Sequence, residues 1–133
     1  MVNDHFGHLL EGPITSPLIW ECTRFCLARS ASPQVAAALM LGGGEIMRGF
    51  GVEHFVGVFD ARMVRIYRMI GASPEVLGSE GQGRKRIAVG LWAFDVQAQV
   101  RVANRAGITA DESHGWFEAS FGNEPQLEWA QIA

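Results

Sequence analysis

A glutamate and an arginine stand three residues apart inside an apolar run of the sequence. Glu21 and Arg24 follow Ile19 and precede Phe25, all within residues 17–28. Charged side chains are costly to bury unless they pair with each other or take part in a reaction. A carboxylate in such a place is one of the side chains that can serve as a general base. The two residues are therefore either an ion pair or the charged part of a catalytic site.

The spacing of the two charges also indicates how the chain runs between them. Residues 17–28 are the first predicted strand, and in a regular strand residues three apart point to opposite faces of the sheet. One extra residue between Glu21 and Arg24, a β-bulge, would bring both side chains to one face. A bulge also leaves a backbone N–H unpaired. We therefore predict a β-bulge here, with a strand end exposed to water as the alternative.

The next element is predicted from a helical start signal and an apolar stripe. Ser32 and Pro33 are typical of an N-cap followed by proline at the first helical position. Apolar residues then recur every three or four positions as far as residue 50, where a glycine follows as a typical stop. The glycine triplet at 42–44 should cost about 1 kcal/mol per glycine relative to alanine. We expect residues 33–50 to bend at the triplet, or another backbone to pack closely against it.

Two further strands and a helix indicate the fold class. Residues 54–60 and 87–94 are mostly apolar, as is typical of buried strands. Residues 96–106 are a predicted helix. Strands that alternate with helices predict an α/β sheet flanked by helices.

Another helix and a loop are predicted between these two strands. Asp60 is expected to cap the helix and Gly71 to end it. Residues 77–83, LGSEGQG, are a predicted loop. They do not form a dinucleotide-binding or phosphate-binding motif, because they precede a strand rather than a helix. The inward stripe of the helix is expected to comprise Met63, Ile66, Tyr67 and Ile70.

The composition indicates one globular domain without a membrane span. The chain has 133 residues, 48% of them hydrophobic and 19% charged, a profile of globular proteins. No apolar run reaches the roughly 20 residues that a membrane helix needs, and no signal peptide is evident, so we expect a cytoplasmic protein. Cys22 and Cys26 would lie about 13 Å apart in a strand, too far for a disulfide. We expect both to be reduced and buried, and we expect no metal site.

The net charge of −3 hides an uneven distribution of charge. All 11 basic residues lie between Arg24 and Arg105, where the chain has six acidic residues. The stretch after Arg105 has five acidic residues and no basic one. The middle of the chain could therefore present a basic face to an acidic partner. Arginines that are simply exposed to water are the alternative.

Three segments, taken together, resemble the acyl-homoserine-lactone synthases, the autoinducer synthases of bacterial quorum sensing. They read WECTRFCL at 20–27, FVGVFDARMVRIYRMIGASPEVLG at 55–78 and IAVGLWAFD at 87–95. The family's pattern is a Trp-Glu-x-x-Arg-Phe strand, a helix, a strand running into a helix with methionine and arginine, and an apolar strand that ends near an acid. The match covers roughly residues 1–95 in order and with few gaps.

The resemblance implies a fold and a reaction. The fold would be similar to that of the Gcn5-related N-acyltransferases. Members of the family take an acyl chain from acyl carrier protein and pass it to the amine of S-adenosylmethionine, whose carboxylate then closes the lactone and expels methylthioadenosine. Acyl carrier protein and S-adenosylmethionine are thus the expected partners. No separate cofactor, nucleic acid or membrane partner is expected.

The resemblance also implies roles for individual residues. Glu21 matches the family's glutamate, a candidate for accepting the amine proton directly or through water, and Arg24 matches the arginine that helps order the charged site. The unpaired N–H of the bulge would donate to the thioester oxygen, and two strands that splay apart there would open a slot for the acyl-pantetheine arm. The residues expected to bind the acyl chain are Phe25, Met40, Gly57 and Val58.

Two details concern specificity and docking. Some members that prefer 3-oxo chains have a threonine where this sequence has Gly57, so the glycine predicts an unsubstituted acyl chain. Arg84, Lys85 and Arg86 precede the last strand and are expected to steer docking of the acidic carrier protein near the mouth of the slot. A basic turn exposed to water is the alternative.

The resemblance divides the chain into two parts. Residues 1–106 are expected to form a partial autoinducer-synthase domain, and residues 107–133 an acidic C-terminal tail. The part of the family that contributes most to the adenosylmethionine site has no match before residue 1, so we expect a synthase that is truncated at its N-terminus. An inactive remnant that self-associates through a free sheet edge, and an N-acyltransferase with another amine acceptor, are the alternatives.

Overall fold

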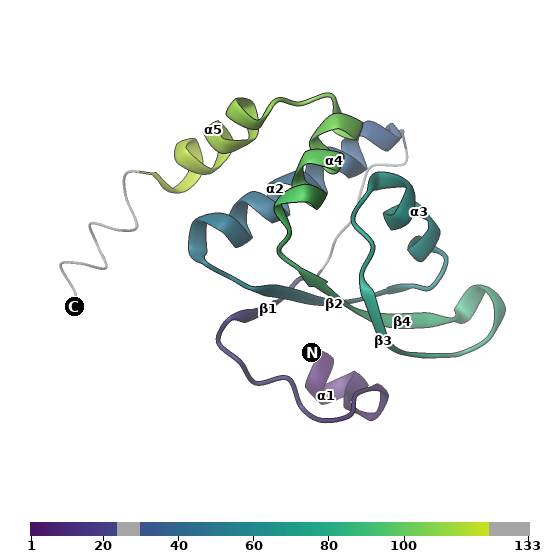
Figure 1. Cartoon of the computed structure of the whole chain (residues 1–133). Helices are drawn as coiled ribbons and strands as arrows, with labels where there is room; N and C mark the ends of the chain where they lie inside the picture. Colours follow the sequence, from purple (N-terminus) through teal and green to yellow (C-terminus); the bar gives the residue numbers. More distant parts are fainter. Residues whose placement is uncertain (24–29, 123–133) are drawn as a thin grey trace.

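The computed structural model describes residues 1–23 and 30–122 and contains a mixed sheet with helices on both faces (Figure 1). The strands lie in the order β1-β2-β4-β3; β1 runs parallel to β2, whereas β4 is antiparallel to both of its neighbours. The predicted α/β class is confirmed. The strands are β1 (Ile19–Glu21), β2 (His54–Asp60), β3 (Glu75–Glu80) and β4 (Ile87–Ala93).

Different helices cover the two faces of the sheet. Helix α1 packs on one face, where Val2 joins Val56 of β2 and Val89 of β4 in a buried cluster. On the other face α2 packs against α4, with α3 beside them (Figure 1). The helices are α1 (Val2–Phe6), α2 (Pro33–Phe50), α3 (Met63–Ile70), α4 (Val96–Ala106) and α5 (Ala110–Phe121), with short 3₁₀ turns at Gly7–Leu9 and Gly83–Lys85.

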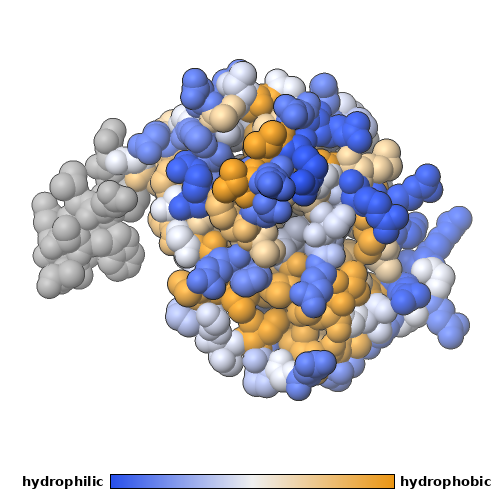
Figure 2. Space-filling model, in the orientation of Figure 1, coloured by the Kyte–Doolittle hydropathy of each residue, from blue (hydrophilic) through white to orange (hydrophobic). Residues whose placement is uncertain are grey.

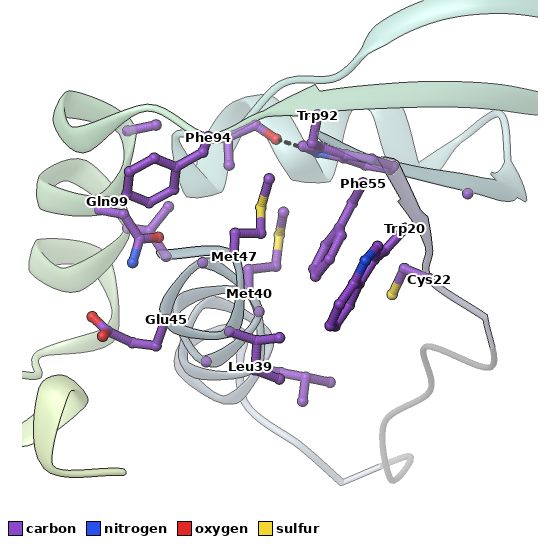
Figure 3. Close-up of a pocket in the computed structure, with 18 of the residues that line it drawn as sticks. Trp20, Cys22, Leu39, Met40, Glu45, Met47, Phe55, Trp92, Phe94 and Gln99 are labelled. Atoms are coloured by element: carbon purple, nitrogen blue, oxygen red, sulfur yellow. Dashed lines mark hydrogen bonds between the residues drawn. The ribbon is translucent and has the colours of Figure 1, made fainter. Parts of the chain in front are cut away.

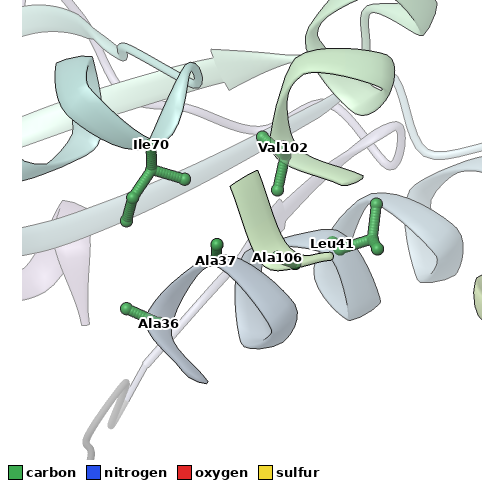
Figure 4. Packing of buried hydrophobic residues seen from close by; sticks show 6 residues of the cluster. All are labelled: Ala36, Ala37, Leu41, Ile70, Val102 and Ala106. Atoms are coloured by element: carbon green, nitrogen blue, oxygen red, sulfur yellow. The ribbon is translucent and has the colours of Figure 1, made fainter. Parts of the chain in front are cut away.

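Helix α2 follows the prediction from the sequence. It begins at Pro33 after the N-cap Ser32 and ends at Gly51, which has a left-handed conformation with φ of 68°. Close packing occurs at the glycine triplet, but against a side chain rather than the predicted backbone: a Cβ on Gly44 would overlap the Gln99 side chain of α4. The cluster of buried residues between α2, α3 and α4, shown in Figure 4, comprises Ala36, Ala37, Leu41, Ile70, Val102 and Ala106.

Two strand predictions are corrected. Residues 77–83 were predicted to be a loop, but β3 occupies Glu75–Glu80 and pairs with β4. Only the turn after β3 matches the prediction, with positive φ angles at Gly81 and Gly83. Pairing with β4, the next strand of the chain, stabilises this strand despite its own low β-propensity. Of the predicted strand 17–28, the structure has Ile19–Glu21 as β1, and residues 24–29 lie outside the described part.

The start of α3 is also corrected. Asp60 is the last residue of β2 and does not cap the helix; its carboxylate accepts hydrogen bonds from the backbone and side chain of Arg62. The hydrogen bond from the Arg62 side chain is the main reason that the pKa of Asp60 is lowered to about 2. Tyr67 and Ile70 are buried as expected, whereas Ile66 is exposed. Gly71 ends the helix in a left-handed conformation, as predicted.

The segment expected to be an acidic tail contains α5. Thr109 is its N-cap and accepts the backbone N–H of Glu112. The helix contacts α2 (Figure 1). Residues 123–133 lie outside the described part, so a domain boundary at 106 stays a prediction.

The surface differs between the two layers. Figure 2 shows hydrophilic residues over α3 and α4, and apolar residues where α1 covers the sheet. Among the described residues, no helix combines the length and apolar character needed to cross a membrane.

Candidate active site

An apolar cavity of about 680 Å³ lies between α2 and the sheet. Figure 3 shows Met40 and Met47 pointing from α2 toward the aromatic side chains of the strands. Trp92 of β4 is held in the wall by a hydrogen bond from its indole N–H to the carbonyl of Ala72, 3.1 Å long. The aromatic residues of the strands in the lining are Trp20, Phe55, Phe59 and Trp92. This lining suits a long apolar group.

The cavity reaches the point where β1 stops pairing with β2. Glu21 is the last paired residue of β1, opposite Val56, and the N–H of Cys22 donates to the carbonyl of Val56 over 2.8 Å. Within the described residues, 1–23 and 30–122, no backbone hydrogen bond joins β1 to β2 beyond this one. Cys22, Thr23 and Gly57 line the cavity here. We call this position, formed by Cys22, Thr23 and Gly57, the β1–β2 gap. Residues 24–29 lie outside the described part, so the predicted slot between splayed strands stays a prediction.

Glu21 lies at the rim of the cavity, with its carboxylate on the face that α1 covers. Its Oε1 accepts the backbone N–H of Val2 at 2.8 Å, and its Oε2 lies 3.2 Å from the amino group of Met1. The side chain is 29% exposed. The neighbouring Trp20 points to the opposite face, where its ring lies 5.6 Å from that of Phe50. One strand thus separates the apolar cavity from a solvated carboxylate.

The other predicted site residues fall into three groups. Arg24 and Phe25 lie outside the described residues, so the predicted bulge and the Glu21–Arg24 arrangement stay predictions. Met40 and Gly57 lie in the cavity lining. Val58 also belongs to the lining, but it packs with the cluster under α1 around Val56.

The glycine at position 57 is packed closely. A Cβ added there would lie 3.1 Å from the carbonyl oxygen of Cys22 and 3.7 Å from the ring of Trp92. A larger side chain would therefore narrow the β1–β2 gap. The prediction of an unsubstituted acyl chain stays untested.

The three basic residues expected to dock a carrier protein lie in the turn between β3 and β4. Arg84, Lys85 and Arg86 are exposed, and Arg86 donates a hydrogen bond of 2.9 Å to the Ser79 hydroxyl. None of the three lines the cavity. They lie at the Asp60 end of β2, because the N–H of Ala61 donates to the carbonyl of Arg86. Their role in docking stays a prediction.

Sequence reasoning missed a buried carboxylate in the cavity lining. Glu45 of α2 is only 3% exposed. Its Oε2 accepts hydrogen bonds from Arg48, the shorter one 2.8 Å long, and its Oε1 accepts the Ser113 hydroxyl of α5 at 3.0 Å. His114 Nε2 lies 3.5 Å from the same Oε1. Contacts between residues 68 positions apart leave no signal in a single sequence.

Two ionisable groups at the cavity have raised pKa values. Cys22 is exposed, which corrects the prediction that it is buried, but partial burial of its thiol raises the thiol pKa. Burial is also the main reason that the pKa of the Tyr67 phenol is raised, and the negative charge of a nearby Cys22 thiolate adds to it. Both groups are therefore neutral near pH 7. Among the residues that the structure describes, no cluster of histidine, cysteine and acidic side chains could hold a metal ion.

The raised pKa of Cys22 leads to a prediction for its chemical reactivity. Alkylation requires the thiolate, so in a Cys26→Ser background iodoacetamide should modify Cys22 more slowly at pH 8 than it modifies free cysteine. The rate should rise with pH, with a midpoint above the ordinary thiol value. Mass spectrometry of the modified chain measures the rate, and a midpoint at the ordinary thiol value would contradict the partial burial of this thiol.

Comparison with known proteins identifies close relatives of the chain. No protein-family model matches it. The acyl-homoserine-lactone synthase of Rhizobium etli is 39% identical over 116 residues, which cover 82% of this chain and 54% of that protein. The synthase of Pseudomonas chlororaphis is 33% identical over 104 residues, which cover 76% of this chain and 52% of that protein. The chain thus spans about half the length of these curated relatives.

Solved structures show the same fold. A structure of the CoA-dependent acyl-homoserine lactone synthase BjaI with MTA matches with a TM-score of 0.72 and 19% identity, over 83% of this chain and 54% of that one. The CoA-dependent synthase MesI matches with a TM-score of 0.70 and 21% identity, over 83% of this chain and 58% of that one. The sheet and its helices are therefore part of the fold of these synthases, which is similar to that of the Gcn5-related N-acyltransferases. With the identity to the curated relatives, this confirms the resemblance seen in the sequence: the chain belongs to the acyl-homoserine-lactone synthase family.

Proposed function

We propose that this protein makes an acyl-homoserine lactone by passing an acyl chain from a thioester to the amine of S-adenosylmethionine. The observation that carries the proposal is the apolar cavity whose lining includes the β1–β2 gap, with the Glu21 carboxylate on the other side of the same strand. An acyl chain in the cavity would place its thioester in the gap, and the charged amine would lie on the solvated side. A structure of BjaI is described with SAM and isopentyl-CoA, a pair of ligands that agrees with this arrangement.

The proposed reaction has two steps. Glu21 accepts a proton from the ammonium group of S-adenosylmethionine, and the free amine attacks the thioester carbonyl. The tetrahedral intermediate collapses, the C–S bond breaks, and the thiolate leaves and takes up a proton. The methionine carboxylate then attacks the side-chain carbon next to the sulfonium. The sulfur keeps the electron pair of the broken bond, and neutral methylthioadenosine departs as the lactone ring closes.

For Glu21 to act as the base, its present contacts must change. The carboxylate is held by the N–H of Val2 and the amino group of Met1. An incoming ammonium group would replace the Met1 amino group, because both are cations that bind the same oxygen. Arg24 is proposed to order the methionine carboxylate. S-adenosylmethionine is a substrate in this scheme, and no separate cofactor is proposed.

The proposed acyl donor is acyl carrier protein, with Arg84, Lys85 and Arg86 as part of its docking surface. These residues are exposed, and a basic patch suits an acidic carrier protein. Acyl-CoA is the alternative donor, favoured by the structural similarity to BjaI and MesI, which are both described as CoA-dependent. Parallel assays with the two donors would distinguish them.

The experiment that tests the function is an assay of the purified chain with each acyl donor and S-adenosylmethionine, with products identified by mass spectrometry. We expect an acyl-homoserine lactone with an unsubstituted acyl chain, together with methylthioadenosine. A product with mainly 3-oxo chains would contradict the interpretation of Gly57. Acyl transfer to a different amine would favour an N-acyltransferase with another acceptor. No acyl transfer with either donor would favour an inactive remnant.

A further inference from the structure

Helix α5 forms part of the cavity wall. Strand β2 starts at His54, shortly after α2 ends, and it reaches Gly57 at the gap about 10 Å further on. Phe117 lies against Gly49 in the last turn of α2, where an added Cβ would overlap its ring. The lining residues from α5 therefore lie beside the last turn of α2, which precedes β2; they are Trp116, Phe117, Ser120 and Phe121.

Aromatic rings form this part of the wall. The ring of Phe50, at the C-terminus of α2, lies 5.2 Å from that of Phe117 and 5.1 Å from that of Phe121. On its other side, Phe50 lies 5.6 Å from the ring of Trp20 in β1. Edge-to-face and tilted rings at these distances attract one another beyond their burial. The rings thus connect β1, α2 and α5 beside the cavity.

A polar contact fixes how α5 is rotated. Ser113 is 1% exposed and donates to the buried carboxylate of Glu45. Residues three and four positions after Ser113 share its helix face, and these are Trp116 and Phe117. The hydrogen bond therefore holds the aromatic face of α5 toward the cavity, although the helix has acidic and polar residues on its other sides.

We propose that the aromatic wall of α5, with Phe117 at its centre, sets the longest acyl chain that the cavity accepts. The inference rests on the proposed function, because it takes the cavity to be the site of the acyl chain. A chain that enters from the β1–β2 gap runs along β2 and meets Phe117 with its terminal methyl group. Every methylene that fits inside the cavity strengthens binding, and a methylene that would have to displace the rings does not.

The test is the binding of saturated acyl-CoA esters of increasing chain length to the 133-residue chain, measured by calorimetry. For the unmodified chain, affinity should rise about fourfold for each added methylene that becomes buried and then level off. In Phe117→Ala the rise should continue to longer chains, because the rings no longer block them. The control is Glu118→Ala, an exposed neighbour on α5 outside the cavity lining, which should keep the original limit.

A second variant keeps the test valid if Phe117→Ala does not fold. Ser120→Leu adds volume to the same wall and should move the limit to shorter chains. An unchanged limit in the folded variants, an equal shift in Glu118→Ala, or no binding of any acyl-CoA would overturn the proposal. The limit on acyl-chain length could move as expected in the variants while the unmodified chain makes no lactone. That result would support the proposal and contradict only the synthase function of this chain.

Discussion

Replacement of Glu21 by glutamine should lower the rate of lactone formation about 10²–10⁴-fold, the usual contribution of a positioned general base. Glutamine has nearly the same shape as glutamate and keeps an oxygen that can accept the N–H of Val2, a contact that is 2.8 Å long in the structure. The amide cannot take up the amine proton. The packing of α1 on the sheet should therefore persist while the chemistry fails.

The measurement is the initial rate of lactone formation, accompanied by acyl-CoA binding on the same samples. Acyl-CoA should bind Glu21→Gln about as well as the unmodified chain, because the acyl cavity lies on the other face of β1. Glu11→Gln, an exposed acid in the segment between α1 and β1, is the matched control and should keep the full rate. Should Glu21→Gln react as fast as this control, Glu21 is not the base.

Replacement of Arg48 by alanine should destabilise the fold by about 2–3 kcal/mol, somewhat less than the about 3–5 kcal/mol typical of a broken, fully buried ion pair. The Glu45 carboxylate is buried, whereas the Arg48 side chain is 41% exposed. Without the arginine, the carboxylate keeps the Ser113 hydroxyl and the more distant His114 as partners. A buried charge with too few partners is the cause of the cost.

Denaturation by urea measures this effect, and a double variant identifies its cause. Arg48→Ala combined with Glu45→Gln removes the buried charge and should recover most of the lost stability, because glutamine can still accept the Ser113 hydroxyl. Arg68→Ala changes an exposed arginine in the last turn of α3 and should alter stability by no more than about 0.5 kcal/mol. If the double variant is as unstable as Arg48→Ala, the buried charge is not responsible.

Elements with local start and stop signals were predictable from the sequence. Helix α2 lies between Ser32-Pro33 and Gly51, and α4 begins after the N-cap Asp95, whose side chain accepts the N–H of Gln97. Strand β3 was not predictable from its own residues, because glycine and acidic residues are depleted in strands, and pairing with the next strand, β4, stabilises it all the same.

The candidate site divides in a similar way. Glu21, Met40 and Gly57 were found because their segments resemble a known family, and the structure places all three at the cavity. Glu45 was not found, because a charged residue in a helical stripe is ordinarily exposed. Its partner Ser113 belongs to α5, which lies in the segment predicted to be an acidic tail. The aromatic wall was missed for the same reason, since the orientation of α5 depends on that contact.

The placement of Trp20 and Glu21 on opposite faces of β1 has a consequence for how the two substrates meet. A sheet is a single layer of backbone, so one strand separates the apolar cavity from the solvated face that holds the Glu21 carboxylate. In the proposed reaction, the apolar acyl chain would stay in the cavity and the charged S-adenosylmethionine would stay in contact with water. Only the thioester carbonyl would then have to lie at this boundary, in the β1–β2 gap. The strand would keep the two substrates apart elsewhere, and the residues of the gap would decide which thioesters react.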